Sequence, residues 1–229
     1  MIGYCKLHGP FSGDECQKCR EEPTGEQEPV PPSGSVVAGQ DLAKHRDYST
    51  YVSLRIQNKV ARIERLQQWN HCDYAIVQAD TVRYCQEDRV RMLGVDQGNA
   101  GEPIVENYQR MGLMVEPVLF TLRSKNDMMT FTRALLQRKI AGSPPYFALP
   151  ARAQNPLVSE LKKQLKQEER IVRSSDIPRY DHPAGSHNDM LWALNIACWM
   201  SRPWMTSPIW AIQATPKPFK AMQTLSQWP

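Results

Sequence analysis

The sequence predicts a mixed α/β domain with a central sheet of about five strands, preceded by a small separate module. Three observations lead to this prediction. Three strand-like segments come first, helix and strand patterns alternate after them, and only helical patterns follow. A chain of 229 residues has room for one such domain and a small appendage.

The composition excludes few functions. Hydrophobic residues make up 41% of the chain, enough for a core, and the net charge of +4 permits nucleic-acid binding without arguing for it. There is no run of 18 apolar residues and no signal-peptide layout, so we expect no membrane span and a cytoplasmic location. In that compartment the six cysteines are thiols or metal ligands rather than disulfides.

Four segments are expected along the chain. Residues 1–20 form the small module, 21–34 a linker rich in proline and glutamate, 35–200 the main domain, and 201–229 a segment rich in tryptophan and proline. The last segment predicts an irregular strap whose tryptophans (Trp204, Trp210 and Trp228) dock on the domain. An exposed arm that binds partners is the alternative.

The first half of the main domain predicts a three-stranded antiparallel meander. A short buried strand runs from Val36 into Asp41, and Val52, Leu54 and Ile56 alternate with polar residues as in a half-buried strand. Gln57–Lys59 is a turn, and Val60–Leu66 is the third strand.

Helices and strands then alternate. A helix over Tyr74–Glu87 is followed by a strand over Val90–Val95 that ends at Asp96, and then by a helix with Pro103 in its first turn. A strand over Met114–Phe120 and a helix over Asn126–Ile140 come next.

The last two predicted elements are helices. The first is amphipathic, with Leu157, Leu161 and Leu165 buried and Lys162, Lys163 and Lys166 outward, and the second runs from Ser186 to about Met200.

The first module carries two pairs of metal ligands. Cys5 and His8 form one C-x2-H pair, and Cys16 and Cys19 form a C-x2-C pair. Two such turns complete the tetrahedral shell that zinc prefers, and so short a segment needs such a staple to fold. We therefore predict a structural zinc site; a tail with incidental cysteines is the alternative. The other cysteines, Cys72, Cys85 and Cys198, are predicted to be small buried hydrophobes.

Three aspartates carry the predicted chemistry. Asp41 and Asp96 each end an apolar strand, and Asp189 lies in the first turn of the last helix. If their strands are neighbours, Asp41 and Asp96 lie side by side, and the helix brings Asp189 close enough to share a cation. Carboxylates that close repel unless cations neutralise them, and hard oxygen ligands suit magnesium or manganese. Such a site holds two ions, one to activate water and one to stabilise the departing oxygen of a phosphodiester.

Each aspartate also has a simpler interpretation. Asp41 could cap a turn, Asp96 could be part of the chemistry of the turn that follows it, and Asp189 lies three residues after Ser186, the spacing of a capping box.

Four stretches of the main domain resemble the nuclease domain of phage large terminase subunits. They are Val36–Lys44 with Asp47–Ser49, Gly94–Pro103, the middle section with Ser124, Lys125 and Ala148–Leu161, and above all Gly185–Leu194. The resemblance covers about residues 35–200. It implies a ribonuclease-H-like fold and two-metal cleavage of double-stranded DNA during genome packaging, with Asp41, Asp96 and Asp189 as metal ligands. His187 and Lys125 match less firmly as auxiliary contacts; a surface histidine and a solvated lysine are the alternatives.

The sequence departs from that family in two ways. No phosphate-binding G-x-x-x-x-G-K-[ST] loop is present, so an ATPase motor or a portal component is expected, if at all, as a separate partner. Asn188 stands where the family often has an acid. Its amide oxygen could ligate a cation without adding charge, or it could face away and merely help to start the helix. Two other functions compete: a resolvase-like nuclease acting on branched DNA, and a packaging module without activity.

Overall fold

The computed structural model describes residues 2–5, 9–12, 33–43, 48–98, 101–137, 146–149, 156–172, 177–183 and 185–205. The chain divides into two compact units, Met1–Ser33 and Gly34–Pro229. In the first unit, β1 (Ile2–Cys5) pairs antiparallel with β2 (Gly9–Ser12). His8, Cys16 and Cys19 lie outside the described residues, so the zinc site stays a prediction.

The second unit is built on a six-stranded mixed sheet with the strand order β7-β6-β3-β4-β5-β8. Strands β3, β4 and β5 form the predicted antiparallel meander, while β6, β7 and β8 join their neighbours in parallel. The bounds are β3 (Ser35–Asp41), β4 (Ser49–Gln57), β5 (Val60–Trp69), β6 (Val90–Asp96), β7 (Val115–Val118) and β8 (Phe147–Ala148). The prediction of five strands is therefore one short, because a two-residue strand such as β8 leaves no alternation in the sequence.

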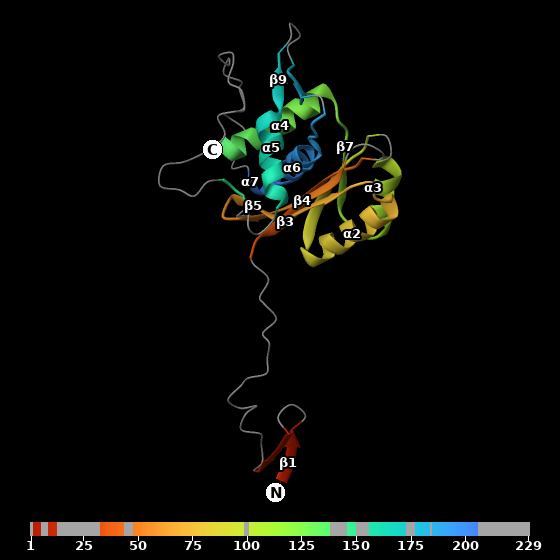
Figure 1. Ribbon diagram of the computed structural model, residues 1–229, viewed down its shortest axis with the longest axis vertical. Helices are drawn as coiled ribbons and strands as arrows, with labels where there is room; N and C mark the ends of the chain where they lie inside the picture. Colours follow the sequence, from red (N-terminus) through yellow and green to blue (C-terminus); the bar gives the residue numbers. More distant parts are fainter. Residues whose placement is uncertain are drawn as a thin grey trace. The chain divides into compact units, whose positions relative to one another are not determined.

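Helices cover both faces of this sheet (Figure 1). The helices α2 (Tyr74–Glu87) and α3 (Gly101–Arg110) pack on one face. The other face carries α4 (Leu122–Gln137), α5 (Leu157–Gln167) and α6 (Asp189–Met200). The consequence for β4 is that it is buried on both faces, with Tyr51 fully buried against α2, and not half-buried as its alternation predicts.

Two helix boundaries differ from the prediction. Helix α4 begins four residues early because Thr121 and Ser124 form a capping box, in which Ser124 N donates to Thr121 Oγ1 and Thr121 N donates to Ser124 Oγ. Helix α6 begins three residues late, at Asp189, because Ser186 turns back to donate through both N and Oγ to Pro183 O.

Three short elements complete the described part of the chain. β9 (Glu169–Ile171) and β10 (Arg179–Asp181) form a separate antiparallel pair that the sequence analysis did not predict. The helix α7 (Arg202–Met205) follows α6, and its Trp204 packs against the core; Trp210 and Trp228 lie outside the described residues. No helix in the described ranges is long and apolar enough to cross a membrane.

The closeness of α6 to the sheet depends on two glycines. A β-carbon at Gly39 on β3 would overlap the backbone of Ala193 and Ala197, and one at Gly94 on β6 would overlap the side chain of Ile196. Because these positions carry no side chain, α6 lies directly on β3 and β6. Its first residue, Asp189, is thereby brought to the end of the sheet where β3 and β6 finish.

Candidate active site

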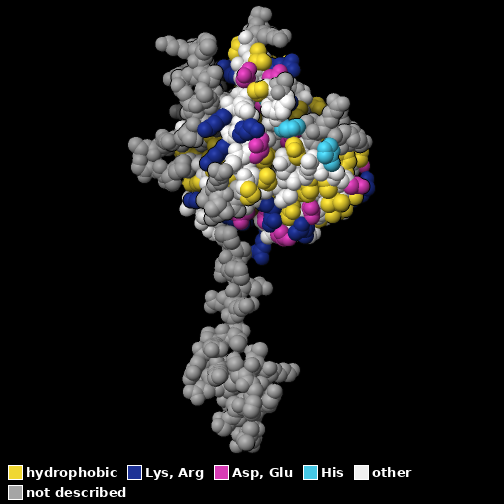
Figure 2. Space-filling view, viewed as in Figure 1, with side chains coloured by type: hydrophobic (Ala, Val, Ile, Leu, Met, Phe, Trp, Pro, Cys, Tyr) yellow, Lys and Arg dark blue, Asp and Glu magenta, His cyan; other side chains and the backbone are white. Residues whose placement is uncertain are grey.

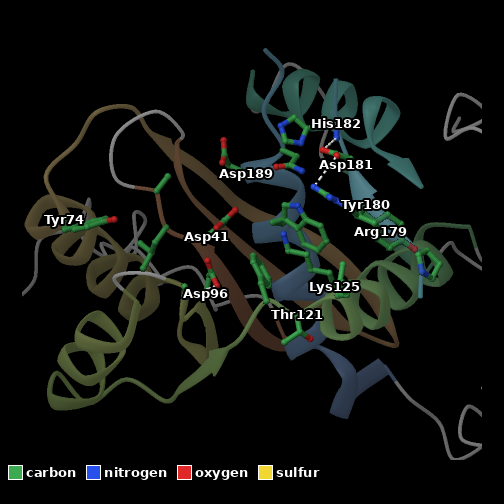
Figure 3. Close-up of a pocket in the computed structure, with 18 residues that line it drawn as sticks. Asp41, Tyr74, Asp96, Thr121, Lys125, Arg179, Tyr180, Asp181, His182 and Asp189 are labelled. Atoms are coloured by element: carbon green, nitrogen blue, oxygen red, sulfur yellow. Dashed lines mark hydrogen bonds and ion pairs between the residues drawn. The ribbon is translucent and has the colours of Figure 1, made fainter. Parts of the chain in front are cut away.

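A cavity of about 760 Å³ opens at the end of the sheet where β3 and β6 finish (Figure 3). Strand ends, the start of α4, the β10 strand and the start of α6 all contribute to it. Its lining residues are Asp41, Leu42, Ala43, Tyr74, Asp96, Gly98, Phe120, Thr121, Leu122, Lys125, Pro178, Arg179, Tyr180, Asp181, His182, Asn188, Asp189 and Trp192. All three predicted aspartates are among them, as are Lys125 and Asn188.

Asp41 and Asp96 lie on neighbouring strands, as predicted. β3 and β6 run parallel with Gln40 opposite Val95, so the next residue of each strand, Asp41 and Asp96, reaches the same edge. The carboxyl ends of parallel strands meet at one edge of a sheet, and this is where α/β proteins commonly bind ligands.

Asp96 takes part in turn chemistry and lines the cavity as well. Gly98 N donates to Asp96 Oδ1 at 3.0 Å, which is the turn bond that the simpler interpretation expects. Burial raises the pKa of Asp96 above its ordinary value, while the hydrogen bond from Gly98 and the charge of Lys125 act in the opposite direction. The turn therefore fixes this carboxylate without taking it out of the site.

Asp189 is the first residue of α6 and is only 7% exposed. Tyr48 N donates to its Oδ2 at 3.4 Å, and His187 Nδ1 lies 3.9 Å from the same oxygen. The capping-box interpretation is wrong, because Ser186 bonds to Pro183 and lies outside the helix. His187 does not line the cavity; it packs edge-on against the Tyr48 ring, with 5.1 Å between the ring centroids.

The three aspartates all line this one cavity. Among the described residues, no group of three or more His, Cys, Asp or Glu side chains is found that could hold a metal ion. Asp96 Oδ1 accepts from Gly98 N, and Asp189 Oδ2 accepts from Tyr48 N and lies 3.9 Å from His187 Nδ1. That all three carboxylates share a cation stays a prediction.

Lys125 faces the aspartates across the cavity in the view of Figure 3. Its Nζ lies 4.8 Å from the centre of the Phe120 ring and 4.6 Å from that of Trp192. Two cation–π contacts hold the ammonium group in place, so Lys125 is not a freely solvated lysine. It is the only residue of α4 beyond Leu122 that lines the cavity.

Asn188 lines the cavity and does not start the helix through its side chain. It occupies the N-cap position of α6 but makes no capping hydrogen bond. Instead, Asn188 Nδ2 donates to Glu168 Oε2 at 3.2 Å. The alternative that Asn188 merely helps to start the helix is therefore wrong.

Sequence reasoning missed one group of cavity residues entirely. Arg179, Tyr180, Asp181 and His182 come from β10 and the residue after it, and Figure 3 shows them on the side of the cavity opposite Asp41 and Asp96. A three-residue strand gives no periodic signal, so nothing in the sequence marks this wall. Glu168, which ends α5 and is 2% exposed, was also missed; a lone glutamate at the end of an amphipathic helix gives no sign that it is buried.

The remaining predictions about side chains hold in part. Lys162, Lys163 and Lys166 are exposed on α5, as predicted, and Figure 2 shows Lys and Arg side chains gathered on the upper part of the described surface. Cys85 and Cys198 are buried, but Cys72 is only half-buried, because it lies in the short segment before α2.

Comparison with known proteins gives a fold and no sequence family. The sequence matches no protein-family model and no curated protein. Its structure is similar to the large terminase nuclease from thermophilic phage G20c with bound magnesium, at 18% identity and a TM-score of 0.60 over 73% of this chain and 82% of that one. It is also similar to the large terminase nuclease domain of Thermus phage P74-26 (18% identity, TM-score 0.57, 72% and 78% covered). A third is a mutant nuclease domain of the large terminase subunit of bacterial virus Sf6 with manganese (14%, 0.54, 77% and 90%).

Proposed function

The second unit has the ribonuclease-H-like fold of large terminase nuclease domains, and we propose that it is a metal-dependent endonuclease that cleaves double-stranded DNA during viral genome packaging. One observation carries the proposal. Asp41, Asp96 and Asp189, which lie far apart in the sequence, line one cavity at the end of the sheet. The three similar solved structures are terminase nucleases or nuclease domains, and two of them contain magnesium or manganese.

The carboxylate oxygens of the cavity are ligands that suit hard divalent cations. Three carboxylates on one wall offer only oxygen, which magnesium and manganese prefer. We propose that the site binds two such ions, as the resemblance to terminase nucleases implies. Bound ions would supply a nucleophilic water at neutral pH and stabilise the departing 3′ oxygen.

The residues opposite the aspartates suit a DNA backbone. Lys125, Arg179 and His182 line the cavity together with Tyr180. A phosphodiester placed between the two walls would meet the three aspartates on one side. On the other side it would meet the nitrogen donors of Lys125, Arg179 and His182, with the carboxylate of Asp181 paired with Arg179 beside them. The ammonium group of Lys125, fixed by Phe120 and Trp192, would donate to a phosphate oxygen and orient the scissile bond.

The test is cleavage by the full chain of supercoiled plasmid, linear duplex and a four-way DNA junction, each with magnesium, manganese or EDTA. We expect metal-dependent cleavage of plasmid and linear duplex. Preference for the junction, together with a dimeric molar mass in solution, would favour the resolvase-like alternative. If no substrate is cleaved with either metal, the result would favour the alternative of a packaging module without activity.

A further inference from the structure

Glu168 is a buried carboxylate behind the wall of the candidate active site. It follows α5, its backbone N donates to Gln164 O, and its side chain is 2% exposed. Its Oε2 accepts the hydrogen bond from Asn188 Nδ2, and its Oε1 has no hydrogen-bond partner in the part of the chain that the structure describes. Burying a carboxylate with one oxygen left without a partner lowers the stability of the fold. The presence of a glutamate at this position therefore suggests a functional role.

The hydrogen bond determines which end of the Asn188 amide points toward α5. The 3.2 Å contact joins Asn188 Nδ2 and Glu168 Oε2, so the NH2 end of the amide faces Glu168. With Nδ2 committed to Glu168, Oδ1 is the end of the planar amide that is left for the cavity that Asn188 lines. Asn188 directly precedes Asp189, so this oxygen is presented on the carboxylate wall.

We propose that Glu168 is a positioning residue for the metal site: it holds the Asn188 amide so that Oδ1 serves as a neutral oxygen ligand for a divalent cation beside Asp189. This inference rests on the proposed function, because it assumes that the carboxylate wall binds divalent cations. An amide oxygen is a hard ligand like a carboxylate oxygen but carries no charge. Removal of a residue that hydrogen-bonds to a metal ligand and orients it typically weakens metal binding about 10- to 100-fold.

The experiment measures manganese affinity by calorimetry on the full chain without DNA, beside the manganese concentration that half-saturates duplex cleavage. Glu168→Met removes the acceptor at similar length, Glu168→Gln retains an acceptor oxygen for Asn188, and Glu169→Met is the matched control at the neighbouring, exposed glutamate. Thermal unfolding checks each fold; Glu168→Met removes a buried charge and should not lower the melting temperature.

We expect Glu168→Met to weaken manganese binding about tenfold or more, Glu168→Gln to recover most of that loss, and Glu169→Met to change nothing. In an Asn188→Ala background, Glu168→Met should add no further loss, because the ligand that it positions is gone. Unchanged affinity in Glu168→Met, equal loss in Glu168→Gln, or additive losses in the double variant would each overturn the proposal. Failure of the wild type to cleave duplex would count against the proposed function alone, since the calorimetric comparison judges Glu168 separately.

Discussion

At the scale of single residues, the candidate site contains side chains whose environments are unlike those of surface groups. Asp96 is half-buried and Glu168 is buried, and burial raises the pKa of both acids. The ammonium group of Lys125 contacts two neighbouring aromatic rings. The three aspartates were predictable because each stands at the end of an apolar pattern. Glu168 was not, because its burial arises from tertiary packing of α5 and α6 that no local pattern reveals.

Glu168 should make the protein less stable as the pH rises. Burial raises the pKa of Glu168 from 4.5 to about 7 in the folded state. Between these two pH values the folded protein keeps a proton that the unfolded chain releases. The destabilising contribution of Glu168 is therefore absent below about pH 4.5 and grows until about pH 7. In EDTA at pH 8, Glu168→Gln should be more stable than wild type by up to about 3 kcal/mol, and the two should converge near pH 4.5. Urea unfolding at both pH values measures this, and an equal difference at both would contradict it.

Lys125 should contribute to cleavage more than to stability. Lys125→Met keeps an apolar side chain of similar length beside Phe120 and Trp192 but removes the charge, so we expect a stability loss of no more than about 1 kcal/mol. Because the ammonium group is proposed to orient a phosphate, duplex cleavage at saturating metal should fall clearly. Lys163→Met, on an exposed face of α5, is the matched control. Equal cleavage by both variants would remove Lys125 from the site.

At the scale of elements, the contact of α6 with β3 and β6 is what assembles the site. The strong periodic elements were predictable: α2 has the predicted bounds, and β3, β4 and β5 form the predicted meander. The elements that the sequence did not reveal, β8, β9 and β10, are only two or three residues long. β8 forms by pairing with the distant strand β5, and β9 and β10 form by pairing with each other. One wall of the cavity was missed for the same reason.

Gly39→Ala should disturb this assembly more than Gly94→Ala. The added methyl group at Gly39 meets the backbone of α6, which can yield only if the whole helix moves, while at Gly94 it meets side chains of Ile196 and Met200. Overpacking typically costs about 1–3 kcal/mol, and we expect Gly39→Ala at the upper end of that range or beyond. It should also weaken manganese binding, because Asp189 moves away from Asp41. Chemical unfolding and calorimetry measure the two effects; the reverse order of the two variants would contradict the account.

At the scale of the whole molecule, the two units should be independent. The chain divides at Ser33, and the main domain begins with β3 at Ser35. Deletion of residues 1–33 should leave cooperative unfolding and duplex cleavage of residues 34–229 intact. Metal analysis should find one zinc in the full chain and none in the truncated one, with the double variant Cys16→Ser/Cys19→Ser as a full-length control. Zinc that persists after truncation, or loss of cooperative unfolding, would show that the units are not separate in this way.

The most direct test of the central claim compares wild type with Asp41→Asn, Asp96→Asn and Asp189→Asn in a single assay of metal-dependent duplex cleavage. Each substitution removes one carboxylate charge from the cavity wall while keeping its shape, so all three variants should unfold cooperatively at or above the wild-type temperature. We expect wild type to cleave duplex with manganese or magnesium and each variant to fall to the level seen in EDTA. Cleavage at the wild-type rate by any folded variant would contradict it.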